Sequence, residues 1–330
     1  MKKLLIFTAA ICFLAAGCSN NEENALTSST KELKVSASSI NCSTSTRSVV
    51  TGESFASGNS IGIFVNGSGY TPKKAIFTVT VTNPSQIWAP TTESDNIYLS
   101  GLSAIVYGFY PASTSVTLDN SENHTSTIDI SVPATDGFNA SSQNDYMYAV
   151  GESVVDNNKS GENSNSTTLN FHHALSELSF IVNLDASYPI DANGNSGKIA
   201  SIKLTSTDDS PFTAGDGTMK VLDGTINITG TSKTLTFTGN ATCNAYKSTP
   251  SANPVAVQLV APKTAIPTSL TLELIIDNKT MSTTLTTPAT SWDAGKNYSY
   301  TITVKGTQLL ISSVSITDWT PATGGSGTVQ

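Results

Sequence analysis

The chain has 330 residues, a formal net charge of −8 and only 13% charged residues, so its length favours two domains and uncharged polar side chains must cover much of its surface. It has no block of basic residues, which makes nucleic acid and anionic membrane surfaces poor partners. Serine, threonine and asparagine replace the missing charges, and this composition suits an extracellular all-β protein because threonine and β-branched residues fit a pleated surface.

The N-terminal residues, MKKLLIFTAAICFLAAGC, predict export from the cytoplasm. Two lysines precede an apolar run and then small residues, a pattern typical of a secretion signal and too short to span a bilayer stably. The signal ends in Ala16-Gly17-Cys18, which resembles the lipobox of bacterial lipoproteins. The resemblance implies that residues 1–17 are removed and that a lipid on Cys18 anchors the protein in the outer membrane, at the cell surface. The alternative is a plain export signal that contains a cysteine by chance.

The next segment, residues 18–47, predicts a polar tether that ends in one short strand and a connector. In KELKVSAS the apolar positions alternate, so Leu33, Val35 and Ala37 are expected on one buried face. The Ser/Thr-rich connector that follows holds Arg47, the only arginine in the chain. Its residue type and place leave three interpretations open: a surface charge, one half of an ion pair, or a site of proteolytic processing.

From residue 48 onward, the sequence has the pattern of two β-sandwiches in series. Short segments such as SIGIFV, AIVYGFYP and STIDISVP alternate or are wholly apolar, are separated by Gly, Pro and Asn, and show no useful helical period. The polar stretch at 156–168 predicts the boundary. We therefore expect an N-terminal sandwich over residues 48–160 and a C-terminal sandwich over residues 161–330.

No motif predicts an enzyme. The GNSIG segment at 58–62 matches a nucleophile-elbow pattern, but it leads into a strand where a helix is required, which favours a turn. His172 and His173 are neighbours in a predicted strand, so their side chains should point to opposite faces and could not chelate one metal. DANGNSG at 191–197 resembles the start of a calcium loop but lacks its glutamate, since Ile202 stands there. We predict no catalytic residue, no cofactor and no metal.

The cysteines leave one pairing open. Cys12 is removed with the signal and Cys18 would be lipidated, so only Cys42 and Cys243 could form a disulfide outside the cytoplasm. The alternative, slightly favoured, is that both are unrelated small apolar residues.

The tryptophans raise a second hypothesis for function. Trp88, Trp292 and Trp319 are expected to pack in a core or at an edge, but aromatic residues at a surface could stack on sugar rings. A monomeric surface lipoprotein that binds glycans through one sandwich face is therefore the alternative to the function considered next.

Several segments, in a fixed order, resemble the fimbrillin family, the pilin lipoproteins of Bacteroidales. The matching segments are the lipobox, TRSVVTGESFASGNSIGIFV at 46–65, FHHALSELSFIV at 171–182, WDAGKNYSYTITV at 292–304 and ISSVSITDW at 311–319. The resemblance implies two tandem transthyretin-like β-sandwiches and a structural or accessory subunit of cell-surface fimbriae that supports adhesion or biofilm formation. Its partners would be other fimbrial subunits, a surface protease and a host or bacterial receptor.

The same resemblance implies assembly by strand exchange. A trypsin-like surface protease would cut between Arg47 and Ser48 and release the first strand. A strand within residues 307–319 of the next subunit would fill the groove, because unpaired N–H and C=O groups above an apolar floor favour an added strand. Ser312-Ser313 shifts the alternation of this donor strand, so its apolar residues are not all expected on one face. They are Leu309, Leu310, Ile311, Val314, Ile316 and Trp319.

Overall fold

The computed structural model describes residues 31–40, 55, 57–81, 86–99, 102, 104–121, 125–139, 143–151, 165–189, 196–207, 209–243, 253–266, 269–286, 291–306 and 308–318. Within these ranges the fold is all-β, as predicted, and its one helical turn is the 3-10 helix η1 (Glu93–Asp95). None of the helical structure found there is long and apolar enough to cross a membrane.

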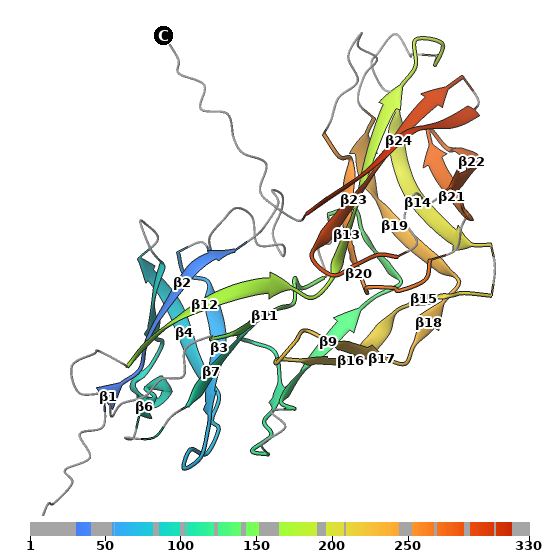
Figure 1. Ribbon diagram of the computed structural model, residues 1–330. Helices are drawn as coiled ribbons and strands as arrows, with labels where there is room; N and C mark the ends of the chain where they lie inside the picture. Colours follow the sequence, from blue (N-terminus) through green and yellow to red (C-terminus); the bar gives the residue numbers. More distant parts are fainter. Residues whose placement is uncertain are drawn as a thin grey trace, which may run out of the picture.

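Seven strands close into a barrel, and most of them come from the N-terminal half of the sequence (Figure 1). Closure leaves this sheet without free edges. A two-stranded ribbon, β1 (Lys31–Glu32) with β6 (Tyr98–Leu99), lies where the chain enters the barrel. The order around the barrel is β11 (Met147–Val150), β12 (Ser166–His173), β2 (Lys34–Ile40), β5 (Gln86–Pro90), β4 (Ala75–Val81), β3 (Ser60–Asn66) and β7 (Ile105–Tyr110).

Two sheets pack face to face in the C-terminal half, as expected for a sandwich. Their inward side chains form one core, in which the rings of Phe180 and Phe237 lie 5.9 Å apart across the two sheets. The first sheet has the order β10 (Thr135–Gly137), β19 (Thr234–Thr242), β14 (Lys198–Ser206), β21 (Ser269–Ile276) and β22 (Lys279–Thr286). The second has the order β20 (Ala256–Val260), β13 (Ser176–Leu184), β23 (Lys296–Lys305) and β24 (Gln308–Asp318).

A further sheet contains strands from both halves of the sequence. Its order is β17 (Ile226–Ile228), β16 (Gly215–Lys220), β9 (Thr127–Val132) and β8 (Val116–Thr117), and the ribbon of β15 (Phe212–Thr213) with β18 (Thr231–Ser232) lies nearby in the chain. A core beside this sheet joins barrel residues such as Phe64 and Phe109 to Ile130, Met219 and Leu259. The two halves are therefore joined by shared packing as well as by the chain.

The sheets do not follow the boundary predicted at residue 160. β12 lies in the barrel, and β10, from the first half of the sequence, pairs in parallel with β19 of the sandwich. The polar stretch at 156–168 thus runs into a barrel strand, and the chain leaves the barrel for the last time between His173 and Ser176. The polar residues here belong to the connection between two strands of the same barrel, β11 and β12.

One glycine of the SIGIFV segment allows a close contact inside the molecule. Gly62 in β3 lies directly opposite Phe109 in β7, and a Cβ atom added at Gly62 would lie 2.1 Å from Cζ of Phe109. Only a residue without a side chain leaves room for this ring.

We expect Gly62→Ala to lower the free energy of unfolding by about 1–3 kcal/mol, because the new methyl group overlaps the ring. Chemical denaturation measures the change. Adding Phe109→Leu to Gly62→Ala should recover part of the loss, since it removes the overlapping atoms. A Gly62→Ala variant as stable as the wild type would contradict the contact.

Candidate strand-exchange site

The first barrel strand, β2, lies between β5 and β12 in the strand order. It runs antiparallel to β5, with Val35 opposite Trp88 and Ala37 opposite Gln86. It runs parallel to β12, with Val35 opposite Thr167. β2 is thus the strand that joins β5 to β12 in the closed barrel, and its removal would leave one edge of each without a partner.

Two side chains of this segment reach the barrel core. Leu33 and Val35 are buried, at 2% and 3% exposure, whereas Lys34 between them is exposed. The predicted buried face is therefore confirmed for Leu33 and Val35, while the side chain of Ala37 lies outside the described part of the structure. Backbone hydrogen bonds fix the entry to β2, since the amide of Leu33 donates to Ile97 O (2.8 Å) and that of Lys34 to Asn165 O (2.8 Å).

The predicted donor strand is β24, at the edge of the second sandwich sheet. It pairs antiparallel with β23 and lies in the half of the molecule away from β2 (Figure 1). Directly opposite residues in such a pair point to the same face. The described donor residues Leu309, Ile311, Val314 and Ile316 lie opposite Val304, Ile302, Tyr300 and Tyr298 respectively, and these four partners are all buried.

A β-bulge accounts for this common face. The pairing register shifts between Thr301 and Ile302, where β24 carries the extra residue Ser312, whose Oγ lies 2.6 Å from Thr303 Oγ1. The shift that the sequence predicts at Ser312-Ser313 is present, but its effect is the reverse of the one expected. It brings the apolar residues on both sides of the bulge to one face, and Leu310 alone of the described donor residues points the other way.

Several predicted positions lie outside the described residues. They are the lipidation site Cys18, the cleavage pair Arg47 and Ser48, the donor residue Trp319, and Cys42. Lipidation, cleavage and a disulfide therefore stay predictions. Cys243 is described and buried, and burial raises the pKa of its thiol to about 12.

The two described tryptophans lie in the cores. Trp88 is 3% exposed in the barrel, and Trp292 is 1% exposed in the sandwich. The Trp292 ring stacks on Phe212 at 5.6 Å, and its Nε1 donates to the Tyr300 hydroxyl at 3.2 Å. Core packing is therefore confirmed for both, so neither offers a surface on which a sugar ring could stack.

The structure places the two neighbouring histidines and the GNSIG segment as follows. His172 is exposed beside Tyr148, whereas His173 is buried with Nδ1 2.8 Å from Asp145 Oδ1, so the two rings lie on opposite faces. Ser60 lies in β3 after a turn at Gly58, as the turn interpretation of GNSIG predicts. Among the described residues, no group of three or more His, Cys, Asp or Glu could hold a metal ion.

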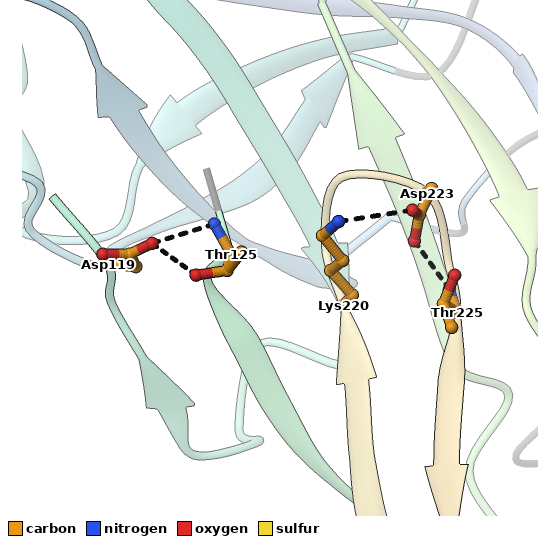
Figure 2. A network of polar contacts seen from close by, with 5 residues as sticks. All are labelled: Asp119, Thr125, Lys220, Asp223 and Thr225. Carbon is orange, nitrogen blue, oxygen red and sulfur yellow. Dashed lines mark hydrogen bonds and ion pairs between the residues drawn. The ribbon is translucent and has the colours of Figure 1, made fainter. Parts of the chain in front are cut away.

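The carboxylates of Asp119 and Asp223 stabilise turns. Figure 2 shows Asp119 accepting hydrogen bonds from the amide and hydroxyl of Thr125, and, in a neighbouring turn, Asp223 beside Lys220 and Thr225. Hydroxyl groups of Ser121 and Thr125, together with their amides, hold the pKa of Asp119 well below its usual range. Such a carboxylate is a poor proton acceptor, which fits a structural role.

Two buried glutamines were not predicted from the sequence. Gln86 Oε1 accepts the amide of Phe55 (3.1 Å) and its Nε2 donates to the carbonyl of the same residue. Gln143 makes the same pair of bonds to Leu259, at 2.8 and 2.6 Å. Each side-chain amide thus hydrogen-bonds both the N–H and the C=O group of one residue, as the backbone of a neighbouring strand would. The available signal was a glutamine beside an apolar strand segment, as in QIWAP.

The comparisons with known proteins agree with this architecture. The family described as fimbrillin-like matches residues 46–319, so the chain belongs to the fimbrillin-like family. No curated protein sequence matches the chain significantly.

Two solved structures share the fold, and a third is a weaker match. A candidate cell adhesion protein from Bacteroides uniformis is 18% identical over 89% of this chain and 99% of its own, with a TM-score of 0.58. One from Bacteroides ovatus is 16% identical over 88% and 98%, also with a TM-score of 0.58. The tip fimbrial protein Mfa3 from Porphyromonas gingivalis, truncated at its C-terminus, is 8% identical over 88% and 100%, with a TM-score of 0.43.

Replacement of the buried side chain that directly precedes β2 should weaken the closed barrel. We expect Leu33→Ala to lower the free energy of unfolding of the uncut chain by about 2–5 kcal/mol, because it leaves a cavity in the core. The exposed neighbour provides the matched control, since Lys34→Ala should change the value by less than about 0.5 kcal/mol. Urea titration followed by tryptophan fluorescence compares the two, and equal effects would argue against a core role for Leu33.

Proposed function

We propose that the chain is a non-enzymatic subunit of cell-surface fimbriae and assembles by strand exchange in support of adhesion or biofilm formation. Family membership supports the fimbrial role. The observation that carries the exchange is the place of β2, since this strand near the N-terminus joins β5 to β12. Val35 in the strand and Leu33 directly before it lie in the core. The predicted cleavage site follows this strand in the sequence.

The acceptor in this proposal is the groove that the loss of β2 would open. Its two edges, on β5 and β12, would present unpaired N–H and C=O groups, which favour any added strand. Its floor would include Trp88 and Leu169, which belong to the same core as Leu33 and Val35. A replacement strand therefore needs apolar side chains on one face only.

β24 has this property. Leu309, Ile311, Val314 and Ile316 share a face. Burial of four such side chains contributes roughly 6–12 kcal/mol before ordering entropy is subtracted. β24 pairs with one strand, β23, and lies in the other half of the molecule from β2. The acceptor for β24 is therefore the groove of a second copy or of another fimbrial subunit.

Cleavage at Arg47 would act as an irreversible trigger. Arg47 is the only arginine in the chain, so an arginine-specific surface protease has a single possible site. The cut would separate β2 and the lipid-bearing Cys18 from everything that follows. One event would thus free the subunit from its membrane anchor and allow its first strand to leave.

Removal of the cleavage site should abolish assembly. We expect Arg47→Lys, treated with an arginine-specific protease, to stay a monomer on unboiled SDS-PAGE, whereas the wild type gives a ladder that disappears on boiling. The lysine keeps the positive charge, so the comparison isolates cleavage. N-terminal sequencing of the cut wild type should begin at Ser48. A cut wild-type chain that stays monomeric and is retarded in polysaccharide gels would favour the glycan-binding alternative.

Two donor residues of equal exposure provide a second test. Leu310 and Ile316 are each 46% exposed but point to opposite faces of β24. We expect Ile316→Asp to stop polymer growth in the cut protein, because the charge would enter the groove of the next subunit. Leu310→Asp should leave growth within about threefold of wild type by size-exclusion chromatography, since we expect this position to face solvent in the complex. Equal growth of the two variants would contradict the proposed use of β24.

A further inference from the structure

Phe55 lies inside the barrel and contacts both strands that border β2. It is fully buried, and its ring centroid lies 5.0 Å from that of Trp88 on β5 and 5.2 Å from that of Phe171 on β12. Both ring pairs meet edge to face, at 81° and 82°. The ring therefore bridges β5 and β12 through the interior, independently of the backbone pairing that β2 provides.

The backbone of Phe55 is also held to β5. The buried side chain of Gln86 accepts the Phe55 amide at 3.1 Å and donates to the Phe55 carbonyl. Gln86 itself lies opposite Ala37 in the register between β2 and β5. Both hydrogen bonds to Phe55 are made by the side chain of Gln86 and not by its backbone. They therefore include no group of β2.

The order of the chain separates Phe55 from β2. Phe55 follows Arg47, whereas β2 precedes it, so a cut after Arg47 divides the two. β5 and β12 run antiparallel to each other, since β2 is antiparallel to the first and parallel to the second. Their exposed edges could therefore pair directly once β2 has left. Such closure would bring them from about 9.5 Å apart to about 4.8 Å and eliminate the groove.

We propose that Phe55 is a strut that holds β5 and β12 one strand-width apart after β2 has left, with Gln86 as its clasp. Direct pairing of the two edges would require the ring to leave its place between Trp88 and Phe171, which the clasp opposes. Phe55 is thus a positioning residue for the acceptor groove. The inference rests on the proposed function only in that it concerns the barrel after the cut at Arg47.

Peptide capture by the cut full-length chain tests the strut. The chain is cut with an arginine-specific protease, and a dye-labelled peptide of residues 31–40 is added as the probe. Fluorescence anisotropy measures its uptake. We expect cut wild type to bind the probe and cut Phe55→Leu to bind it at least tenfold more weakly, since leucine fills the core but does not reach both rings.

Phe77→Leu is the matched control. Phe77 is equally buried in the same core, but it lies on β4, which β5 and β2 separate from β12 in the strand order. The same substitution there should leave capture within threefold of wild type, with thermal unfolding of the uncut variants as the check on folding. Gln86→Ala should weaken capture in the same direction as Phe55→Leu.

The outcomes separate this inference from the proposed function. Equal capture by cut wild type and cut Phe55→Leu, or the same loss in Phe77→Leu, would overturn the strut, as would a cut wild type that binds no probe. Capture needs neither β24 nor polymer growth. If the wild type and Phe55→Leu differ tenfold but polymers never form, the strut holds and the fimbrial assembly fails.

Discussion

Backbone hydrogen bonding across β2 is the interaction on which the rest of the N-terminal half depends. A closed barrel satisfies every strand edge, and β2 supplies the pairing for both β5 and β12. Leu33 and Val35 add apolar side chains to the described core. The segment is therefore held by two backbone ladders as well as by buried side chains. A strand held in this way is replaceable in principle, because a ladder does not depend on the identity of the side chains that accompany it.

The proposed donor strand, β24, is suited to exchange for the same reasons of backbone pairing and side-chain packing. Among the described strands, β24 pairs along one edge only, with β23, and its bulge at Ser312 places four apolar residues on a common face. In its own sheet this face packs with the buried residues of β23, and in the proposed exchange it would cover the floor of a barrel. The common requirement is a strand whose apolar side chains all point one way. Donor and displaced strand can therefore serve the same site without sharing a sequence.

Local pattern predicted much of this fold. Alternation placed Leu33 and Val35 on a buried face, separated His172 from His173, and located the irregularity at Ser312-Ser313. What it could not predict depends on distant partners. Nothing near β2 indicates that it pairs in parallel with β12, or that β8 and β9 share a sheet with β16 and β17. The polar stretch before β12 suggested a domain boundary because polarity marks a surface connection and carries no information about which strands it joins.

The candidate strand-exchange site was likewise predictable from the sequence only in part. The residues of β24 were identified from their apolar character, but their common face was not, because a bulge is fixed by pairing with β23. Phe55 stands alone in a polar segment, so no periodic pattern singles it out. Its burial comes from rings on β5, β7 and β12, three strands that meet only in the folded barrel. The burial of Gln86 is likewise explained only by its hydrogen bonds to the backbone of Phe55.

The parallel ladder between β2 and β12 also bears on the timing of biogenesis. A chain that is synthesised from its N-terminus presents Lys34 long before Ser166, so the barrel cannot close until about half the polypeptide is available. Pairing over such a separation in sequence is also intrinsically slow. The first barrel strand must therefore remain without β12 throughout that interval, and its unpaired edge stays open to other strands until β12 arrives.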